Sequence, residues 1–256
     1  MRYALDVQYR GKYYDGSQIQ FEAGKEIGTT VQGELERALR TLIIGKTSEN
    51  RPIKTIFSGR TDKGVNSLGQ VVHFDYDKDI VASKFIYQMN EILPNDISVS
   101  NLRIVPDSFH AQKSAKSRYY RYELINRKYK QAFDGDILRV KYDLDIERMQ
   151  TALNFLLGEH DFSSFKSSGT LNPSKVCFIS RAEVERFGEW GDRVFIHIEG
   201  NRFLYNMVRT IVGTLLEIEG HNLPVEHMKN VLEARDRRKA GQTVSPYGLT
   251  LVKVEY

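Results

Sequence analysis

The stretch KTIFSGRTDKGVNSLGQVVHFDY, residues 54–76, joins two short apolar segments through a loop rich in glycine and charge. The apolar segments contain many β-branched and aromatic residues, which are typical of strands. The loop between them carries one carboxylate, Asp62, flanked by the cations Arg60 and Lys63. We therefore expect two strands with a charged turn, and the elements on either side decide the architecture.

The first half of the chain predicts the order strand, helix, strand, strand, helix, strand. Tyr3, Leu5 and Val7 alternate with polar residues, and Thr30 is a suitable N-cap for a helix with apolar residues at helical spacing. The predicted elements are a strand at 2–9, a helix at 30–43, strands at 54–58 and 70–76, a helix at 82–93 and a strand at 97–105. This order is that of a ferredoxin-like half, with Asp62 between its second and third strands.

The second half repeats the order with longer insertions and no sequence repeat. The predicted elements are strands at 118–126, 177–188, 192–200 and 249–256, and helices at 145–158, 202–220 and 224–235. We predict an α+β fold of two tandem ferredoxin-like (RRM-like) halves, 1–105 and 106–256, divided near Pro106. Their antiparallel sheets are expected to join into one extended sheet, with helices on one face and a catalytic cleft between the halves.

Composition excludes several classes of protein. The chain has 256 residues, 41% of them hydrophobic, and no apolar run approaches the roughly 20 residues that span a bilayer. We expect a cytoplasmic protein without a membrane partner. The lone Cys177 excludes an intramolecular disulfide framework, and the six histidines lack metal-ligand spacing, so no metal site is expected.

The segment QKSAKSRYYRYELINRKYK, residues 112–130, concentrates positive charge and tyrosine. It contains seven cations against Glu123 alone, although the formal net charge of the chain is only +4. Cations that neutralise phosphates, interleaved with rings that stack on bases, favour an RNA-binding surface. The alternative is a solvated strand edge protected by lysines. The RNA candidates here are Lys116, Arg118, Tyr120 and Arg121.

Two other nucleotide-binding motifs are absent. GRTDKG has the outer glycines of a phosphate-binding loop, but Val65 and Asn66 stand where Lys and Ser or Thr are required. A nucleotide triphosphatase is therefore disfavoured. No RNP1 stretch is present either, which argues against a simple RNA-recognition module.

The chain resembles the TruA family of tRNA pseudouridine synthases. GRTDKGVNSLGQVVHF is similar to the family signature GRTDxGV, and five further regions are similar in order and spacing. These are YRGKYYDGSQIQ with TVQGELERAL, FHAQKSAKSRYYRYEL, GEHDFSSF, NRFLYNMVRTIVGTLLEIEG and SPYGLTLVKVEY. The resemblance implies an isomerase that converts uridine to pseudouridine in the anticodon stem-loop of tRNA (uridines 38–40). It also implies tandem ferredoxin-like halves, a homodimer, and no metal or organic cofactor.

The resemblance places the catalytic aspartate at Asp62, the active-site tyrosine at Tyr120, and two active-site arginines at Arg60 and Arg209. An aspartate acts as a nucleophile only when ionised, and a nearby guanidinium favours that form against desolvation. We expect Arg209 to be the ion-pair partner of Asp62 and Arg60 to contact RNA. Tyr120 is expected to stack on the flipped base and to help move a proton.

Three positions depart from the family pattern. Lys63 and Asn66 replace the residues that many relatives have, although Asn66 keeps a hydrogen-bonding side chain and stays a candidate RNA contact. Ser17 stands where an aromatic residue is usual, so a stacking contact would be lost and another uridine could be chosen. Two rival functions remain: a catalytically silent tRNA-binding protein or chaperone, and a synthase of the same fold that acts on another RNA.

Overall fold

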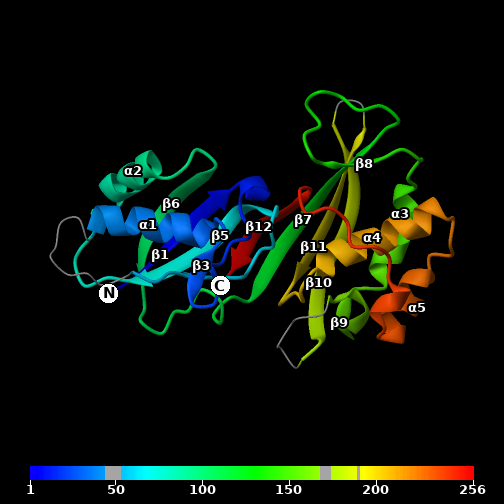
Figure 1. The fold of residues 1–256 in the computed structure, drawn as a ribbon. Coiled ribbons are helices and arrows are strands. Elements are labelled where there is room, and N and C mark those ends of the chain that lie inside the picture. Colours follow the sequence, from blue (N-terminus) through cyan, green and yellow to red (C-terminus); the bar gives the residue numbers. More distant parts are fainter. Residues whose placement is uncertain (44–52, 168–173, 189–190) are drawn as a thin grey trace. The chain divides into compact units, whose positions relative to one another are not determined.

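The structure, a computed structural model, describes residues 1–43, 53–167, 174–188 and 191–256. The chain forms two compact units (Figure 1). The first contains Met1–Lys116 and Leu251–Tyr256, and the second contains Ser117–Thr250. Both contain helices and antiparallel strands, so the predicted α+β class is confirmed. The division into functional halves at 1–105 and 106–256 stays a prediction.

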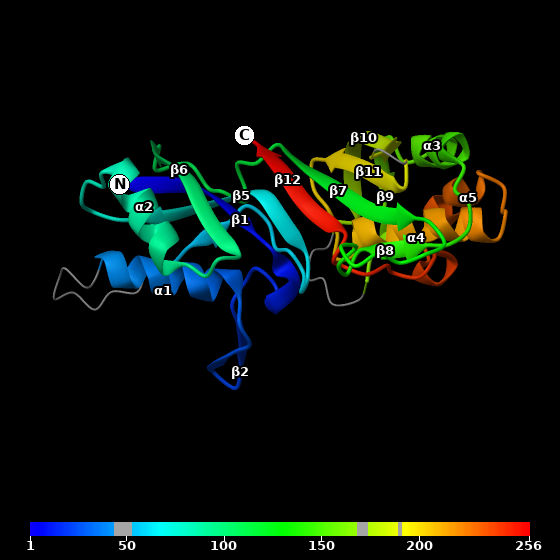
Figure 2. The ribbon, with the colours of Figure 1, turned by 90° about the horizontal axis from the view of Figure 1, so that it is seen from above.

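The first unit is built on an antiparallel sheet (Figure 2). Its strands are β1 (Arg2–Tyr9), β4 (Ile56–Phe57), β5 (Asn66–Asp75), β6 (Ile97–Val105) and β12 (Leu249–Glu255), of which the first two residues belong to the second unit. Its helices are α1 (Val31–Ile43) and α2 (Ala82–Ile92), and a 3-10 turn spans Gly11–Tyr13. The strand order is β6-β1-β5-β12, with β4 also paired to β5. The predicted connection that carries Asp62 therefore runs between β4 and β5.

Both helices of this unit cover the same face of the sheet. Leu35 and Leu39 from α1 and Phe85 and Met89 from α2 share one buried cluster with Leu5 from β1. Residues two apart on a strand face the same side, so the inward stripe of β1 continues along the strand. The first turn of α1 is capped as predicted, because Thr30 Oγ1 accepts a hydrogen bond from Gly33 N at 3.1 Å.

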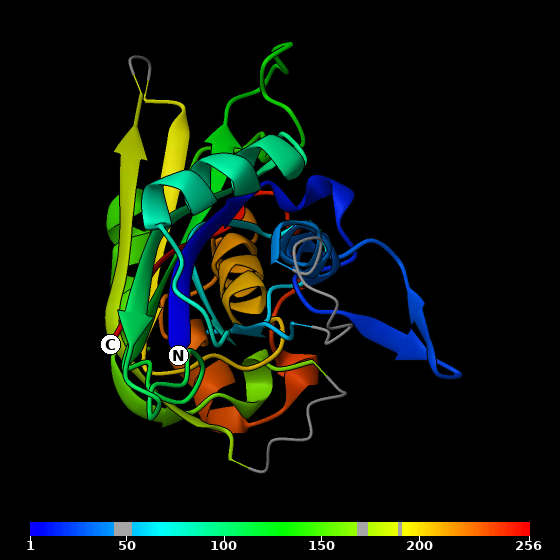
Figure 3. The same cartoon turned by 90° about the vertical axis from the view of Figure 1, so that its left-hand side faces the viewer.

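A small hairpin, β2 (Gln20–Glu22) with β3 (Lys25–Ile27), precedes α1. It projects beyond the helix in Figures 2 and 3, and all six of its strand residues are exposed. The hairpin was not predicted.

The second unit has the sheet order β7-β11-β10-β9, and β8 pairs in parallel with β7. Its strands are β7 (Ser117–Asn126), β8 (Leu138–Val140), β9 (Gly158–Asp161), β10 (Val176–Phe187) and β11 (Arg193–Gly200), its helices are α3 (Ile146–Asn154), α4 (Met207–Gly220) and α5 (His227–Ala234), and 3-10 turns span Ser163–Phe165 and Arg237–Lys239. The three helices contact one another, and α3 packs along β10.

Several element boundaries differ from the prediction. The strand expected at 70–76 begins earlier, at Asn66, and the helix expected at 202–220 begins later, at Met207. Asn206 has φ +62°, in the left-handed region, so the helix cannot extend backwards through it. The helix expected at 145–158 ends at Asn154, and the one expected from Pro224 begins at His227.

Across the described ranges, which exclude 44–52, 168–173 and 189–190, no helix combines the length and apolar character needed to cross a membrane.

Candidate active site

Asp62 lies in the loop between β4 and β5, and its side chain is half-buried. The loop turns tightly after it, because Val65 N donates to Asp62 O at 3.1 Å and Gly64 has φ +84°. Gly64 is thus required by a backbone conformation that other residues rarely adopt. The charged segment is a turn, as its composition predicts.

Buried side chains from distant parts of the first unit form hydrogen bonds with this loop. The hydroxyl groups of Tyr9 and Thr61 lie 2.7 Å apart, and Thr61 N donates to Ser17 Oγ at 2.8 Å. Gln70 Nε2 donates to Gly59 O at 2.9 Å. Burial raises the pKa of the Tyr9 phenol, so this group stays protonated and able to donate. The backbone on the N-terminal side of Asp62 is therefore fixed at two residues, Gly59 and Thr61.

The rim of the loop is charged. Arg60 is exposed, and Lys63 forms an ion pair with Asp15 at 2.8 Å. The Lys63 ammonium, with a hydrogen bond from a backbone N–H, holds the pKa of Asp15 below its usual range. Asn66 Oδ1 accepts a hydrogen bond from Gly11 N at 2.9 Å, so part of its polar capacity joins β5 to the turn after β1.

Tyr120 lies in the middle of β7, opposite Ile198 of β11, and is 9% exposed. Its ring meets the Phe203 ring edge-on, with 5.1 Å between centroids. The tyrosine ring therefore packs against an aromatic neighbour within the second unit.

Arg209, in the first turn of α4, is half-buried and oriented by two acceptors. Its Nε donates to Val244 O at 2.8 Å and its Nη1 donates to Asn206 Oδ1 at 2.7 Å. Burial raises the pKa of the neighbouring Tyr122 phenol, an effect that the positive charge of Arg209 opposes. The guanidinium and the Tyr122 hydroxyl donate to the carbonyl oxygens of adjacent residues, Val244 and Ser245.

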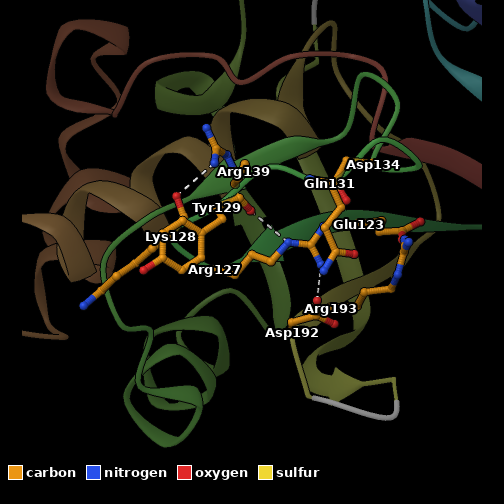
Figure 4. A network of polar contacts seen from close by, with 9 residues as sticks. All are labelled: Glu123, Arg127, Lys128, Tyr129, Gln131, Asp134, Arg139, Asp192 and Arg193. Atoms are coloured by element: carbon orange, nitrogen blue, oxygen red, sulfur yellow. Dashed lines mark hydrogen bonds and ion pairs between the residues drawn. The ribbon is translucent and has the colours of Figure 1, made fainter.

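The basic segment 112–130 divides its cations between structural and exposed positions. Arg121 lies over the Phe195 ring, 4.6 Å from its centroid, and Arg118 Nη1 donates to Asn201 O at 2.9 Å. Arg127 forms ion pairs with Asp134 and Asp192 at the base of the loop that follows β7 (Figure 4). The exposed cations of the segment are Lys113, Lys116, Lys128 and Lys130. An RNA surface here would depend on the lysines more than on the arginines.

The predicted site residues are divided between the two units and between the two faces of β7. Tyr120 and Arg121 point to opposite faces of β7, because successive residues on a strand alternate. Asp62, Arg60, Asn66 and Lys116 belong to the first unit, whereas Tyr120, Arg118, Arg121 and Arg209 belong to the second. The expected approach of Asp62 to Tyr120 and Arg209 stays a prediction.

Four residues that support the site were not predicted to do so: Tyr9, Ser17, Gln70 and Asn206. Gln70 offered a signal, because it occupies an inward position of its strand together with Val72 and Phe74. A polar residue at such a position needs partners in the interior. The partners themselves are 11 to 61 residues away in sequence, and no local pattern names them.

In the part of the chain that the structure describes, no group of three or more His, Cys, Asp or Glu residues is arranged to hold a metal ion.

Comparison with known proteins identifies the family. Residues 152–256 match a family model described as tRNA pseudouridine synthase. The tRNA pseudouridine synthase A of Shewanella amazonensis is 39% identical over 100% of this chain and 93% of its own length. Those of Thermoanaerobacter sp. (38% identical, 98% of this chain, 97% of the relative) and Pseudomonas aeruginosa (41%, 100% and 85%) are similar to the same extent.

Among solved structures, the Cbf5-Nop10-Gar1 complex aligns with a TM-score of 0.40 and 10% identity, over 97% of this chain and 48% of that chain, too low a score to support an argument. The matches to the Shewanella and Pseudomonas relatives cover the whole of this chain, including the loop that carries Asp62. The chain therefore belongs to the tRNA pseudouridine synthase A family.

Proposed function

We propose that this protein isomerises uridine to pseudouridine in the anticodon stem-loop of tRNA, with Asp62 as the residue that initiates the reaction. The observation that supports this most strongly is the Asp62 loop itself, a charged turn anchored by buried side chains within a chain 38–41% identical to tRNA pseudouridine synthases A. Loops held rigidly by a scaffold are the usual location of catalytic groups.

The reaction needs the residue types that the two units supply. The N1–C1′ bond of the nucleotide breaks, a C5–C1′ bond forms, the C5 proton leaves and N1 takes up a proton, so the composition of the RNA is unchanged. Asp62 acts in its ionised form, and we propose Arg209 as the cation that favours this form. Tyr120 stacks on the flipped uracil and helps to move the C5 or C2′ proton.

Arg60, Lys116, Arg118, Arg121 and Asn66 are proposed to contact the RNA. Arg60 and Lys116 are exposed and suited to phosphates, whereas Arg118, Arg121 and Asn66 are half-buried. Arg118 and Asn66 are oriented by hydrogen bonds within the protein, and Arg121 by its contact with the Phe195 ring. We expect these three to set the register of the RNA.

The finer architecture belongs to the same proposal. In the first unit, the strand order β6-β1-β5 with β4 also paired to β5, and with α1 and α2 as crossovers, supports a ferredoxin-like half. We propose a second such half in residues 106–256, a joined sheet with the cleft between the halves, and a homodimer that acts in the cytoplasm.

Tritium release from tRNA whose uridines are labelled at C5 tests the activity. We expect wild-type protein to release tritium into water from unmodified bulk tRNA. Carbodiimide primer extension on the product should then place the pseudouridines in the anticodon arm. Binding of tRNA without tritium release would support the catalytically silent alternative, and product only in another RNA would support the second rival.

A further inference from the structure

Five buried polar side chains form a hydrogen-bonded group at the start of the Asp62 loop, and we call this group the loop clamp: Tyr9, Ser17, Ser58, Thr61 and Gln70. Each is at most 6% exposed, and Ser17, Ser58 and Gln70 are fully buried at 0%. They come from β1, from the segment before α1, from the loop and from β5. Their placement in the interior gives them no direct access to a bound RNA.

Gln70 uses both ends of its amide on the backbone at the start of the loop. Its Oε1 accepts hydrogen bonds from the backbone N and the hydroxyl of Ser58, the former at 3.1 Å. Its Nε2 donates to Gly59 O at 2.9 Å and reaches the Tyr9 hydroxyl at 3.5 Å. One side chain thus holds two successive residues of the loop and links them to β1.

Ser17 holds the residue next to Asp62. Its Oγ accepts from Thr61 N at 2.8 Å, and its backbone N donates to Thr61 O at 3.0 Å. The same segment anchors the helix, because Val31 N and Gln32 N of α1 donate to the carbonyl oxygens of Gly16 and Ser17. Ser17 and its neighbour Gly16 therefore connect Thr61 to the first turn of α1.

A stable interior does not need these groups. Buried polar atoms contribute little net stability when they are hydrogen-bonded, and they are costly when a partner is missing. What a fully satisfied network provides is a single geometry, and the geometry fixed here is that of Gly59 to Thr61, immediately before Asp62. Displacement of a reacting group by about 1 Å can lower a rate by about 100-fold.

We propose that the loop clamp, through Gln70 and Ser17, positions the Asp62 carboxylate for catalysis. This inference depends on the proposed role of Asp62. It gives the serine at position 17 a function of its own: in this chain the residue is a buried support of the catalytic loop, where the resemblance led us to expect a lost contact with RNA.

Two matched pairs of variants test the proposal. Ser17→Ala removes a fully buried hydroxyl that accepts a backbone N–H at 2.8 Å, and Ser164→Ala removes another, which accepts Asp236 N at 2.9 Å in the second unit. Gln70→Leu removes an amide that bonds backbone on both sides. Gln150→Leu does the same where α3 meets β10, at Val184 N and Ala182 O, both 3.0 Å away.

Steady-state kinetics on tRNA and thermal unfolding should be measured for all four variants. We expect Ser17→Ala and Gln70→Leu to lower kcat by about 10- to 100-fold with an unchanged KM. Ser164→Ala, at a position as fully buried as Ser17, should lose a similar amount of thermal stability, and Gln150→Leu, at a half-buried position, should lose less than Gln70→Leu. Both controls should keep kcat and KM. If Gln70→Leu does not fold, Ser17→Ala decides.

Wild-type kcat in folded Ser17→Ala, or an equal loss of kcat in Ser164→Ala, would overturn the positioning role. Asp62→Asn, measured in parallel, separates this failure from failure of the proposed function. An inactive Asp62→Asn beside a fully active Ser17→Ala rejects only the loop clamp, whereas an active Asp62→Asn rejects the catalytic role of Asp62 and the clamp with it.

Discussion

Arg209 and Tyr122, which come from different elements, donate hydrogen bonds to two adjacent residues of the segment 241–245. Arg209 Nε on α4 binds Val244 O, and the Tyr122 hydroxyl on β7 donates to Ser245 O at 2.9 Å. Tyr120 lies two residues before Tyr122 on β7, so both side chains point to the same face of the strand, and its ring contacts the Phe203 ring. The proposed base-stacking group and the proposed cation of the second unit are thus both held in place by their neighbours.

Tyr120→Phe keeps the ring that meets Phe203 and removes only the group proposed to move a proton. We expect kcat to fall by about 100-fold or more, with tRNA affinity retained, in a tritium-release assay. Tyr142→Phe, which loses a hydrogen bond to Leu216 O at 2.8 Å in the same unit, is the control. Full turnover by Tyr120→Phe would exclude the proton-transfer role and leave stacking alone.

His73 makes stability depend on pH. It is 3% exposed, its Nδ1 accepts from Ala111 N at 3.1 Å, and burial, reinforced by the nearby charge of Arg2, lowers its pKa from 6.5 to about 4. Between these values the unfolded chain binds a proton that the folded chain does not. The contribution of the neutral histidine to stability is therefore complete above pH 6.5 and declines as the pH falls toward 4.

Thermal unfolding of wild type and His73→Asn across this range measures the effect. Asparagine keeps an acceptor for Ala111 N and does not titrate. The midpoint of the wild type should fall more steeply with acid than that of the variant. Parallel curves would show that His73 does not contribute the acid sensitivity.

The contact between α4 and the segment 241–245 determines where Arg209 is held. Gly213 allows this close contact, because any residue with a Cβ at this position would overlap the Gln242 carbonyl oxygen. A hydrogen bond from Gly241 N to Thr214 Oγ1, at 2.9 Å, joins the same two segments. The helix and the segment therefore touch backbone to backbone along this length.

Gly213→Ala should reverse the usual effect of alanine in a helix. Alanine ordinarily stabilises a helix interior by about 0.5–1 kcal/mol relative to glycine. Here the methyl group must displace backbone, and we expect a loss of about 1–3 kcal/mol in the free energy of unfolding, measured in urea. Gly33→Ala in α1 places a Cβ near two side-chain atoms, Glu26 Oε1 at 2.8 Å and Thr30 Oγ1 at 3.2 Å, and near no backbone, so it should be less destabilising than Gly213→Ala. Equal stabilisation of both variants would contradict the close packing at Gly213.

Elements with strong periodicity could be predicted, and those shaped by distant partners could not. The apolar stripe and the Thr30 cap locate α1 within one residue of its observed start. The β2–β3 hairpin is wholly exposed and leaves no apolar alternation, and the start of α4 is set by the left-handed Asn206. Both features are invisible to a search for hydrophobic periodicity.

The same distinction holds for the candidate site. The charged turn around Asp62 could be predicted because its signature is contiguous in sequence. The residues that support the loop could not be predicted, because Ser17 and Tyr9 are 44 and 52 residues away from their partner Thr61 in sequence. Such contacts exist only after the sheet and α1 have formed.

Over the whole chain the charge is nearly balanced, at +4, so binding to RNA must depend on local clusters of cations. Among the cations of 112–130, the lysines are exposed, whereas Arg127 is held by two aspartates (Figure 4). Affinity that comes from exposed lysines should respond strongly to salt.

Titration of tRNA affinity against salt concentration tests this distribution. We expect log affinity to fall linearly with log salt, and Lys116→Ala to weaken binding and reduce the slope by about one. Lys229→Ala, which replaces an exposed lysine of α5, should change neither. A flat salt profile for the wild type would contradict an RNA surface built from lysines.

The most direct measurement is single-turnover conversion of uridine in tRNA by Asp62→Asn, with the dissociation constant for tRNA determined on the same preparation. An amide replaces the carboxylate with little change in size, so we predict unchanged tRNA affinity and a rate lower by about 1,000-fold or more. Conversion by Asp62→Asn at the wild-type rate would contradict catalysis by the Asp62 carboxylate.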